Sequence, residues 1–192
     1  MSLYIFRKKA YRTSYLACDS MPADTQKTDY IGVFTVTAGK EIENRIEYYK
    51  QQDDNYNALL LQSLSDRIAE AATELLHYRV RKEIWGYSPN ETATVENLLK
   101  EHYQGIRPAI GYPSLPDQSL AFDIDKLLGF VQIDVSLTEN GAMKPNSTVS
   151  GIMIAHPQSA YFHIGQIDME QRAEYCKKRN FSIEDSYKWL SV

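Results

Sequence analysis

Hydrophobic residues recur at helical spacing over the longest patterned segment of the chain, from about Tyr56 to Ile84. They stand three and four positions apart, at Leu60, Leu64, Ile68, Ala71, Ala72 and Leu75. This spacing places them on one face of an α-helix. We therefore predict a helix on the order of 40 Å long, with this leucine-rich face buried.

Shorter patterned segments surround this helix. β-branched and aromatic residues predict strands at 30–39, 131–137, 148–156 and 161–167. Helical patterns occupy 40–52, 94–103, 117–130, 168–180 and 182–190. Strands and helices do not alternate regularly, which argues against a doubly wound parallel sheet. We expect an α+β fold with a twisted, mainly antiparallel sheet, several flanking helices and one long central helix.

Residues 1–29 differ from the rest of the chain because they mix basic, polar and small residues without a sustained period. We interpret this segment as an N-terminal arm or the end of a fragment cut from a longer protein; a natural standalone domain is the alternative. We interpret residues 30–192 as one domain. The chain of 192 residues is 43% hydrophobic, which is enough for a core of ordinary size.

Composition narrows the classes of function. A net charge of −4 argues against a protein that mainly binds nucleic acid, and no apolar run approaches the roughly 20 residues that a membrane span needs. The two cysteines, Cys18 and Cys176, are too few for a disulfide framework or an all-cysteine zinc site. These observations favour a reduced, cytoplasmic protein without a nucleic-acid or membrane partner.

The usual catalytic signatures are missing from the sequence. It has no phosphate-binding glycine loop, no dinucleotide fingerprint, no serine elbow and no zinc-binding helix. The four histidines do not have metal-ligand spacing, and we interpret each as a surface or core residue: His77, His102, His156 and His163. We therefore predict no catalytic residue and no metal ligand.

The segment "GIRPAIGYPS" at 105–114 is the strongest candidate for a binding site. Its prolines prevent a helix, so its backbone amides and carbonyls would be available to a ligand. Arg107 offers a planar fork of donors that suits a carboxylate, and Tyr112 offers a flat ring. These groups could hold a zwitterionic or nucleoside-like molecule; the alternative is a rigid turn with a surface arginine.

A second candidate lies on the long helix, where Asp66 and Glu70 stand one turn apart. Like charges at this spacing destabilise a helix slightly. The pair could be part of a solvated helix face, or an acidic patch for a cationic or protonatable partner.

Five stretches together resemble the C-terminal activation domain of cobalamin-dependent methionine synthase, and they cover most of the chain from Asp29 to the end. They are "DYIGVFTVTAG", "DDNYNALLLQSLSDRIAEAATELLHYRVRKEIWGYSPNE", "YQGIRPAIGYPSLPD", "LTENGAMKPNSTVSGIMIAHPQSAYFHIGQI" and "YCKKRNFSIEDSYKWL".

The resemblance implies site residues. It assigns S-adenosylmethionine binding to Arg107, Pro108, Ala109, Gly111, Tyr112, Tyr161 and Phe162. Arg107 would contact the methionine part and the backbone near Ala109 would hold the ligand, while Tyr112 would lie where the methyl group meets the corrin. Phe162 lacks the hydroxyl found at the second position of a tyrosine–aromatic pair in the family. The residues that would face the cobalamin-binding domain are Asp66, Glu70 and Glu101.

The resemblance also implies a function and partners. The domain would position S-adenosylmethionine over a corrinoid for reductive methylation of cob(II)alamin. A cobalamin-binding domain of methionine synthase would hold the cobalamin, and flavodoxin or a similar reductase would supply the electron. We do not expect this domain to be catalytic alone.

Two alternatives stay open: a standalone S-adenosylmethionine-dependent methyltransferase, and a docking module that has lost the ligand. An upstream acidic ligand contact of the family has no match in residues 1–29, which implies weakened ligand affinity.

Overall fold

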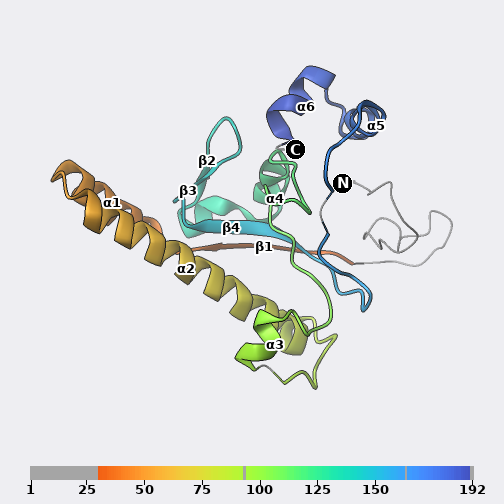
Figure 1. Ribbon diagram of the computed structural model, residues 1–192, viewed down its shortest axis with the longest axis horizontal. Coiled ribbons are helices and arrows are strands. Elements are labelled where there is room, and N and C mark those ends of the chain that lie inside the picture. The colour runs from red at the N-terminus through yellow and green to blue at the C-terminus, as the bar shows by residue number, and fades with distance from the viewer. Residues whose placement is uncertain (1–29, 93, 163, 191–192) are drawn as a thin grey trace.

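The computed structural model describes residues 30–92, 94–162 and 164–190; the predicted arm at 1–29 lies outside this part of the chain. The helices are α1 (Lys40–Gln51), α2 (Asn55–Arg79), the π-helical segment η1 (Val80–Ile84), α3 (Val95–Leu99), α4 (Leu120–Leu128), the 3-10 segment η2 (Phe130–Ile133), α5 (Met169–Arg179) and α6 (Ile183–Trp189). The strands are β1 (Gly32–Thr37), β2 (Ser136–Leu137), β3 (Met143–Lys144) and β4 (Thr148–Met153). Figure 1 shows their arrangement.

Two small antiparallel sheets form in the described residues. β1 pairs with β4 from Gly32 opposite Met153 to Thr37 opposite Thr148, and β2 pairs with β3. Both sheets are therefore far smaller than the single extended sheet that four predicted strands would allow. The predicted α+β class, the antiparallel pairing and the long helix are confirmed.

The β1–β4 pair lies between α2 and α4 (Figure 1). Residues alternate across the two faces of a strand, so Ile152 and its partner Val33 pack into the core with α4. That core contains residues from α4, from the 105–115 segment, and from η2 and β4 or the residues just after them, namely Ile106, Ile110, Leu115, Leu120, Ala121, Ile124, Phe130, Val135, Ile152 and Ile154. Phe34 and Met153, on the opposite face, are buried on the side of α2.

The long helix forms where the periodicity predicts it, and Asp54 caps it by accepting a hydrogen bond from the Asn57 amide at 3.1 Å. The prediction of its buried face is wrong. The buried side chains are small or polar, namely Ala58, Ser65, Ala69, Thr73 and His77, whereas Leu60, Leu64, Ile68 and Leu75 are 47–59% exposed.

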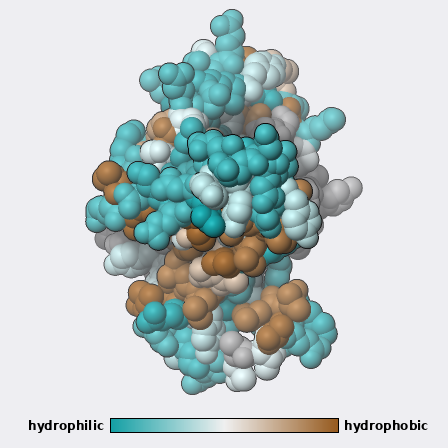
Figure 2. Space-filling view, turned by 90° about the vertical axis from the view of Figure 1, so that its left-hand side faces the viewer, coloured by the Kyte–Doolittle hydropathy of each residue, from teal (hydrophilic) through white to brown (hydrophobic). Residues whose placement is uncertain are grey.

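Packing distance explains this reversal. Small side chains let α2 approach the sheet closely, and the buried hydroxyls are satisfied locally, since Thr73 Oγ1 donates to the Ala69 carbonyl at 2.8 Å. The row of leucine and isoleucine side chains that the pattern predicts to be buried therefore lies on the surface of α2. Figure 2 views the side of the molecule where α1 and α2 lie, and hydrophobic surface gathers in its lower half.

One predicted strand forms only at its end, and another does not form in the described residues. In the first, at 131–137, Gly129 and Asp134 adopt left-handed backbone angles (φ 68° and 55°), so η2 replaces most of the expected strand and only β2 remains of it. In the second, at 161–167, the apolar residues pack against the C-terminal helices instead of against a neighbouring strand. There Phe162 and Ile164 contact the cluster around Tyr175.

The C-terminal helices are tied to the start of α4 by a buried polar cluster. Arg179 on α5 forms ion pairs with Asp117 at 3.4 Å and with Asp123 at 2.8 Å, and the Tyr175 hydroxyl donates to Asp117. Among the described residues, no helix is both long enough and apolar enough to cross a membrane.

Candidate functional site

The candidate binding segment docks along β4 as an additional, irregular strand. The Ile106 and Ile154 amides each donate to the other residue's carbonyl at 2.9 Å, the Ile110 amide donates to Ser150 at 2.9 Å, and Ile152 donates to Pro108 at 3.1 Å. The expectation that the backbone of this segment is free for a ligand is therefore wrong for most of its groups. The sheet uses them, and this fixes the position of the segment.

Gly151 on β4 makes this docking possible. It lies directly opposite Ala109, and a Cβ added at Gly151 would lie 2.9 Å from the Ala109 Cα and closer still to the Pro108 carbonyl oxygen. Real Cβ atoms do not approach backbone atoms so closely. The absence of a side chain at this position therefore sets the distance between the segment and the sheet.

Along the edge of the segment that faces away from β4, two backbone amides do not bond to the sheet. Alternate residues of an antiparallel strand direct their amides to opposite sides. The Arg107 amide accordingly donates to the Tyr161 hydroxyl at 3.0 Å, and the Ala109 amide, which points away from β4, has no hydrogen-bond partner in the described part of the chain.

This edge borders two neighbouring cavities, of about 320 and 500 Å³. The smaller cavity is lined by Glu70, Glu74, Leu98, Leu99, Glu101, Tyr103, Arg107, Ala109, Tyr112, Ser114 and Tyr161. The larger one is lined by Ser63, Asp66, Arg67, Ala69, Glu70, Ala109, Ile110, Tyr112, Met143, Asn146, Ser147, Thr148, Val149 and Ser150. Glu70, Ala109 and Tyr112 border both.

The structure thus sorts the predicted residues into two groups. Arg107, Tyr161 and Glu101 meet in the smaller cavity, whereas Asp66 borders only the larger one. Tyr112 stands between them and is half exposed, and its hydroxyl donates to Glu70 Oε1 at 3.1 Å. Burial, together with the nearby Glu70 carboxylate, raises the pKa of Tyr112.

Three predicted residues do not line either cavity. The Pro108 carbonyl is occupied by Ile152. Gly111 occupies a turn with φ 84°, where its amide donates to Leu115. Phe162 packs against the C-terminal apolar cluster. These three therefore shape the segment or its surroundings without facing the cavities.

A polar network that the sequence analysis missed fixes Asp66. Its Oδ1 accepts hydrogen bonds from Ser147 Oγ at 2.7 Å and from Gln62 Nε2 at 2.8 Å. The Ser147 and Ser65 hydroxyl oxygens lie 2.6 Å apart. No sequence signal connects Ser147 with Asp66, since 81 residues separate them.

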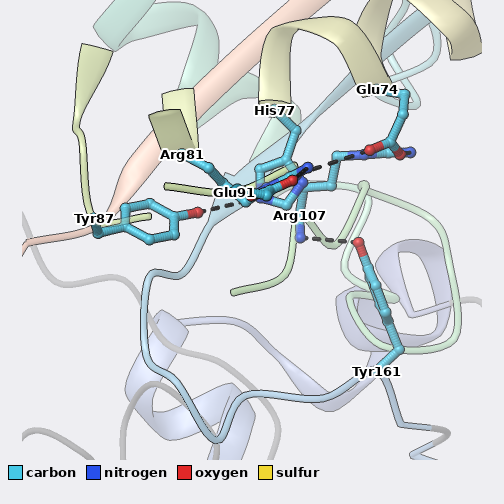
Figure 3. Close-up of polar contacts among 7 residues, drawn as sticks. All are labelled: Glu74, His77, Arg81, Tyr87, Glu91, Arg107 and Tyr161. Atoms are coloured by element: carbon cyan, nitrogen blue, oxygen red, sulfur yellow. Dashed lines mark hydrogen bonds and ion pairs between the residues drawn. The ribbon is translucent and has the colours of Figure 1, made fainter. Parts of the chain in front are cut away.

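A cluster of ion pairs includes two residues that line the smaller cavity, Glu74 and Arg107. Figure 3 shows the residues of this cluster. Glu74 on α2 accepts a hydrogen bond from Arg107 Nη2 at 2.9 Å, and its Oε1 lies 3.8 Å from Arg81 Nη1. Arg81 is fully buried and donates to both Glu91 oxygens at 2.7 Å. The Arg81 guanidinium also lies 3.9 Å from the centre of the Tyr103 ring. Two arginines therefore converge on Glu74.

Burial and charge set the protonation of the side chains around this cluster. Burial opposes the charge on Arg107, but the hydrogen bond to Glu74 and neighbouring groups raise its pKa overall. Burial raises the pKa of Tyr161, so its phenol stays protonated at neutral pH. Burial, followed by the charges of Arg81 and Arg107, lowers the pKa of His77 to about 3, and this imidazole is neutral.

The buried neutral His77 predicts a pH dependence of stability. The unfolded chain binds a proton at an ordinary pKa of 6.5, while the folded chain does so only at about 3. His77 therefore lowers the free energy of unfolding as the pH falls through this range, by about 1.4 kcal/mol per pH unit. Urea titrations between about pH 6 and about pH 4 should give a shallower pH slope for His77→Gln than for the unsubstituted chain. His102→Gln, at an exposed position, should leave the slope unchanged, and equal slopes for all three proteins would contradict the prediction.

Sequence reasoning missed Glu74 and Arg81, although spacing gave a signal for one of them. Glu74 follows Asp66 and Glu70 at further four-residue steps on the same helix. No sequence signal indicated that Arg81 is buried, because arginines are rarely fully buried. No cluster of three or more histidine, cysteine or acidic side chains suited to a metal ion occurs in the described residues.

Comparison with known proteins identifies the family. A family model described as the vitamin B12-dependent methionine synthase activation domain matches residues 6–180. The chain is also similar to a crystal structure of the MetH reactivation domain bound to AdoHcy, with a TM-score of 0.78 and 40% sequence identity. This similarity covers 84% of the present chain and 51% of the MetH chain, so our chain spans about half the length of that protein. The resemblance found in the sequence motifs is confirmed, and the chain belongs to the family of activation domains of vitamin B12-dependent methionine synthase.

Proposed function

We propose that this chain binds S-adenosylmethionine in the smaller cavity and positions its methyl group for reductive methylation of cob(II)alamin held by a partner domain. The observation that carries the proposal is the convergence of Arg107, the Ala109 amide and the Tyr161 side chain at one cavity edge. The related MetH domain was crystallised with AdoHcy, which has the same adenosyl and amino-acid parts as S-adenosylmethionine.

The chemistry of these groups fits such a ligand. Arg107 keeps a buried Nε without a hydrogen-bond partner among the described residues, and a guanidinium is suited to a carboxylate. The Ala109 amide offers a further donor, and the Tyr112 and Tyr161 rings offer flat surfaces. A volume of about 320 Å³ falls in the range of small-molecule sites.

In this proposal the domain holds S-adenosylmethionine in position for methyl transfer and does not activate it chemically. S-adenosylmethionine supplies an electrophilic methyl group, and the cobalamin of the partner supplies the metal that accepts it. Arg107, Ala109 and Tyr161 would fix the orientation of the ligand, which can lower the barrier of a bimolecular step by several kcal/mol. No side chain of this chain has to act as a nucleophile.

The second cavity is the proposed contact with the partner. Asp66 and Glu70 border it, and Ser147 and Gln62 hold the Asp66 carboxylate. A fixed carboxylate on an open surface suits a cationic or protonatable group of the cobalamin-binding domain. Glu101 is exposed at the rim of the smaller cavity, where it could contact the same partner.

The proposed electron donor is flavodoxin or a similar reductase, in the cytoplasm.

The experiment mixes the purified chain with a cobalamin-binding domain, reductant and S-adenosylmethionine, and follows the visible spectrum. The methylcobalamin spectrum should return only when the chain and S-adenosylmethionine are both present. Arg107→Ala should weaken ligand binding about 10- to 100-fold, because a charge-assisted hydrogen bond is lost.

The controls separate the alternatives. Methyl transfer to a small acceptor without corrinoid would favour a standalone methyltransferase. Partner binding without measurable S-adenosylmethionine binding, unaffected by Arg107→Ala, would favour a docking module. Lys126→Ala is a matched control, because this exposed lysine pairs only at 3.5 Å with Asp123 on α4, away from both cavities.

A further inference from the structure

The wall of the smaller cavity contains an ion pair with unused hydrogen-bonding capacity on both sides. Arg107 and Glu74 are joined by one hydrogen bond, from Nη2 to Oε2 at 2.9 Å. Within the described residues, Arg107 Nε and Glu74 Oε1 are buried and have no hydrogen-bond partner. The pair therefore offers one cationic donor and one anionic acceptor next to each other (Figure 3).

Glu74 is not needed to neutralise the other arginine nearby. Arg81 already donates to both oxygens of Glu91 at 2.7 Å, which is the strongest geometry for an arginine–carboxylate pair. Its distance from Glu74, 3.8 Å between Nη1 and Oε1, is too long for a hydrogen bond. Glu74 is thus held between two guanidinium groups while only Arg107 bonds to it.

The charges of the cluster balance. Arg81 and Arg107 carry two positive charges, Glu74 and Glu91 carry two negative charges, and His77 between them is neutral. The amino-acid end of a ligand brings one carboxylate and one ammonium, and so leaves this total at zero. A carboxylate or an ammonium alone at this position would leave an unbalanced charge in a partly buried site, which is unfavourable.

We propose that Glu74 is a ligand-binding residue that accepts the α-ammonium group of the bound amino acid while Arg107 binds its α-carboxylate. The inference rests on the proposed function, since it assigns the carboxylate and the ammonium of the amino-acid end of S-adenosylmethionine. When the ligand enters, Arg107 Nε donates to its carboxylate and Glu74 Oε1 accepts from its ammonium. Each side chain keeps an oppositely charged partner, and the buried Nε and Oε1 gain one.

Two other roles for Glu74 would give different results. If Glu74 only oriented Arg107, its loss would weaken every ligand that carries the carboxylate, with or without the ammonium. If Glu74 competed with the ligand for Arg107, its loss would strengthen binding. The ammonium-binding role alone makes the effect of Glu74 depend on the ammonium group.

The test measures the affinity of S-adenosylmethionine and of its deamino analogue by calorimetry, for the unsubstituted chain and for Glu74→Gln. The unsubstituted chain should bind the deamino analogue about tenfold more weakly than S-adenosylmethionine. Glu74→Gln should weaken S-adenosylmethionine by about the same factor and leave the deamino analogue within about twofold. Glu83→Gln, an exposed carboxylate in η1 paired with Arg79, should change neither affinity.

Every outcome decides between the roles. If the unsubstituted chain binds neither ligand, the proposed function fails and this inference with it. If it binds both equally well, only the inference is overturned, and this comparison needs no variant to fold. Equal weakening of both ligands in Glu74→Gln assigns an orienting role, and tighter binding assigns a competing role; either result overturns the proposal.

Discussion

Replacing Arg81 with methionine is expected to lower the free energy of unfolding by about 3–5 kcal/mol, because it leaves a buried carboxylate without its partner. The Arg81 side chain is 0% exposed and that of Glu91 only 8%. Both Glu91 oxygens accept their hydrogen bonds from Arg81. The substitution also removes the guanidinium from the face of the Tyr103 ring. Urea unfolding followed by circular dichroism measures the effect.

Two comparisons isolate the cause of this loss. Arg79→Met breaks a pair with Glu83 in which both side chains are more than half exposed, and should cost at most about 0.5 kcal/mol. The double variant Arg81→Met/Glu91→Met leaves no buried charge of this pair unpaired, and should recover part of the stability lost in Arg81→Met. A double variant less stable than the single one would contradict the explanation.

Gly151→Ala is expected to abolish measurable S-adenosylmethionine binding by displacing the segment that carries Arg107 and Ala109. The added Cβ would lie 2.9 Å from the Ala109 Cα and nearer to the Pro108 carbonyl. Both are backbone atoms that cannot rotate away, so the whole segment has to move from β4. Overpacking of this kind costs about 1–3 kcal/mol of stability, and a displacement of 1 Å at a positioning site has large functional effects.

Gly32→Ala on β1 is the matched control for this substitution. Its added Cβ would lie 3.1 Å from the Met153 Cβ on the same face of the sheet. It would contact a side chain instead of the backbone of the binding segment. This variant should be destabilised without losing ligand binding, as measured by calorimetry. Loss of binding in Gly32→Ala but not in Gly151→Ala would refute the explanation.

The positions of the helices were predictable because their start signals are local. Asp54, Thr94 and Ser182 each cap a helix by accepting a hydrogen bond from an amide three residues later. Asp185 completes a capping box with Ser182, although glutamate or glutamine is usual at that position. Chemistry within one turn decides these boundaries, and the sequence contains all of it.

The buried face of α2 was not predictable from its periodicity. The pattern shows that Leu60 and Leu64 share a face with Ile68, but not whether another part of the chain covers that face. The sheet selects the face with Ala69 and Thr73 because small residues allow close approach. The wrong prediction of a strand at 161–167 has a similar cause, since Phe162 and Ile164 pack against helices instead of against a strand.

The sequence motifs predicted the site residues that lie within them. They did not predict the residues that only the fold brings to the site. Arg107, Ala109, Tyr112 and Tyr161, which the motifs assign to one ligand, all line the smaller cavity. Glu74 went unnoticed because a charged residue on a helix is usually solvated. Its partner Arg107 stands 33 residues away in the sequence, and only the fold brings the two together.

The pairing of the 106–110 segment with β4 also bears on the entropy of ligand binding. Flexible binding loops lose conformational freedom when they close on a ligand, and this loss weakens affinity. Here hydrogen bonds to Ser150, Ile152 and Ile154 already immobilise the backbone. The backbone donors of this segment are therefore already ordered before a molecule enters the site, and binding costs no further backbone freedom there.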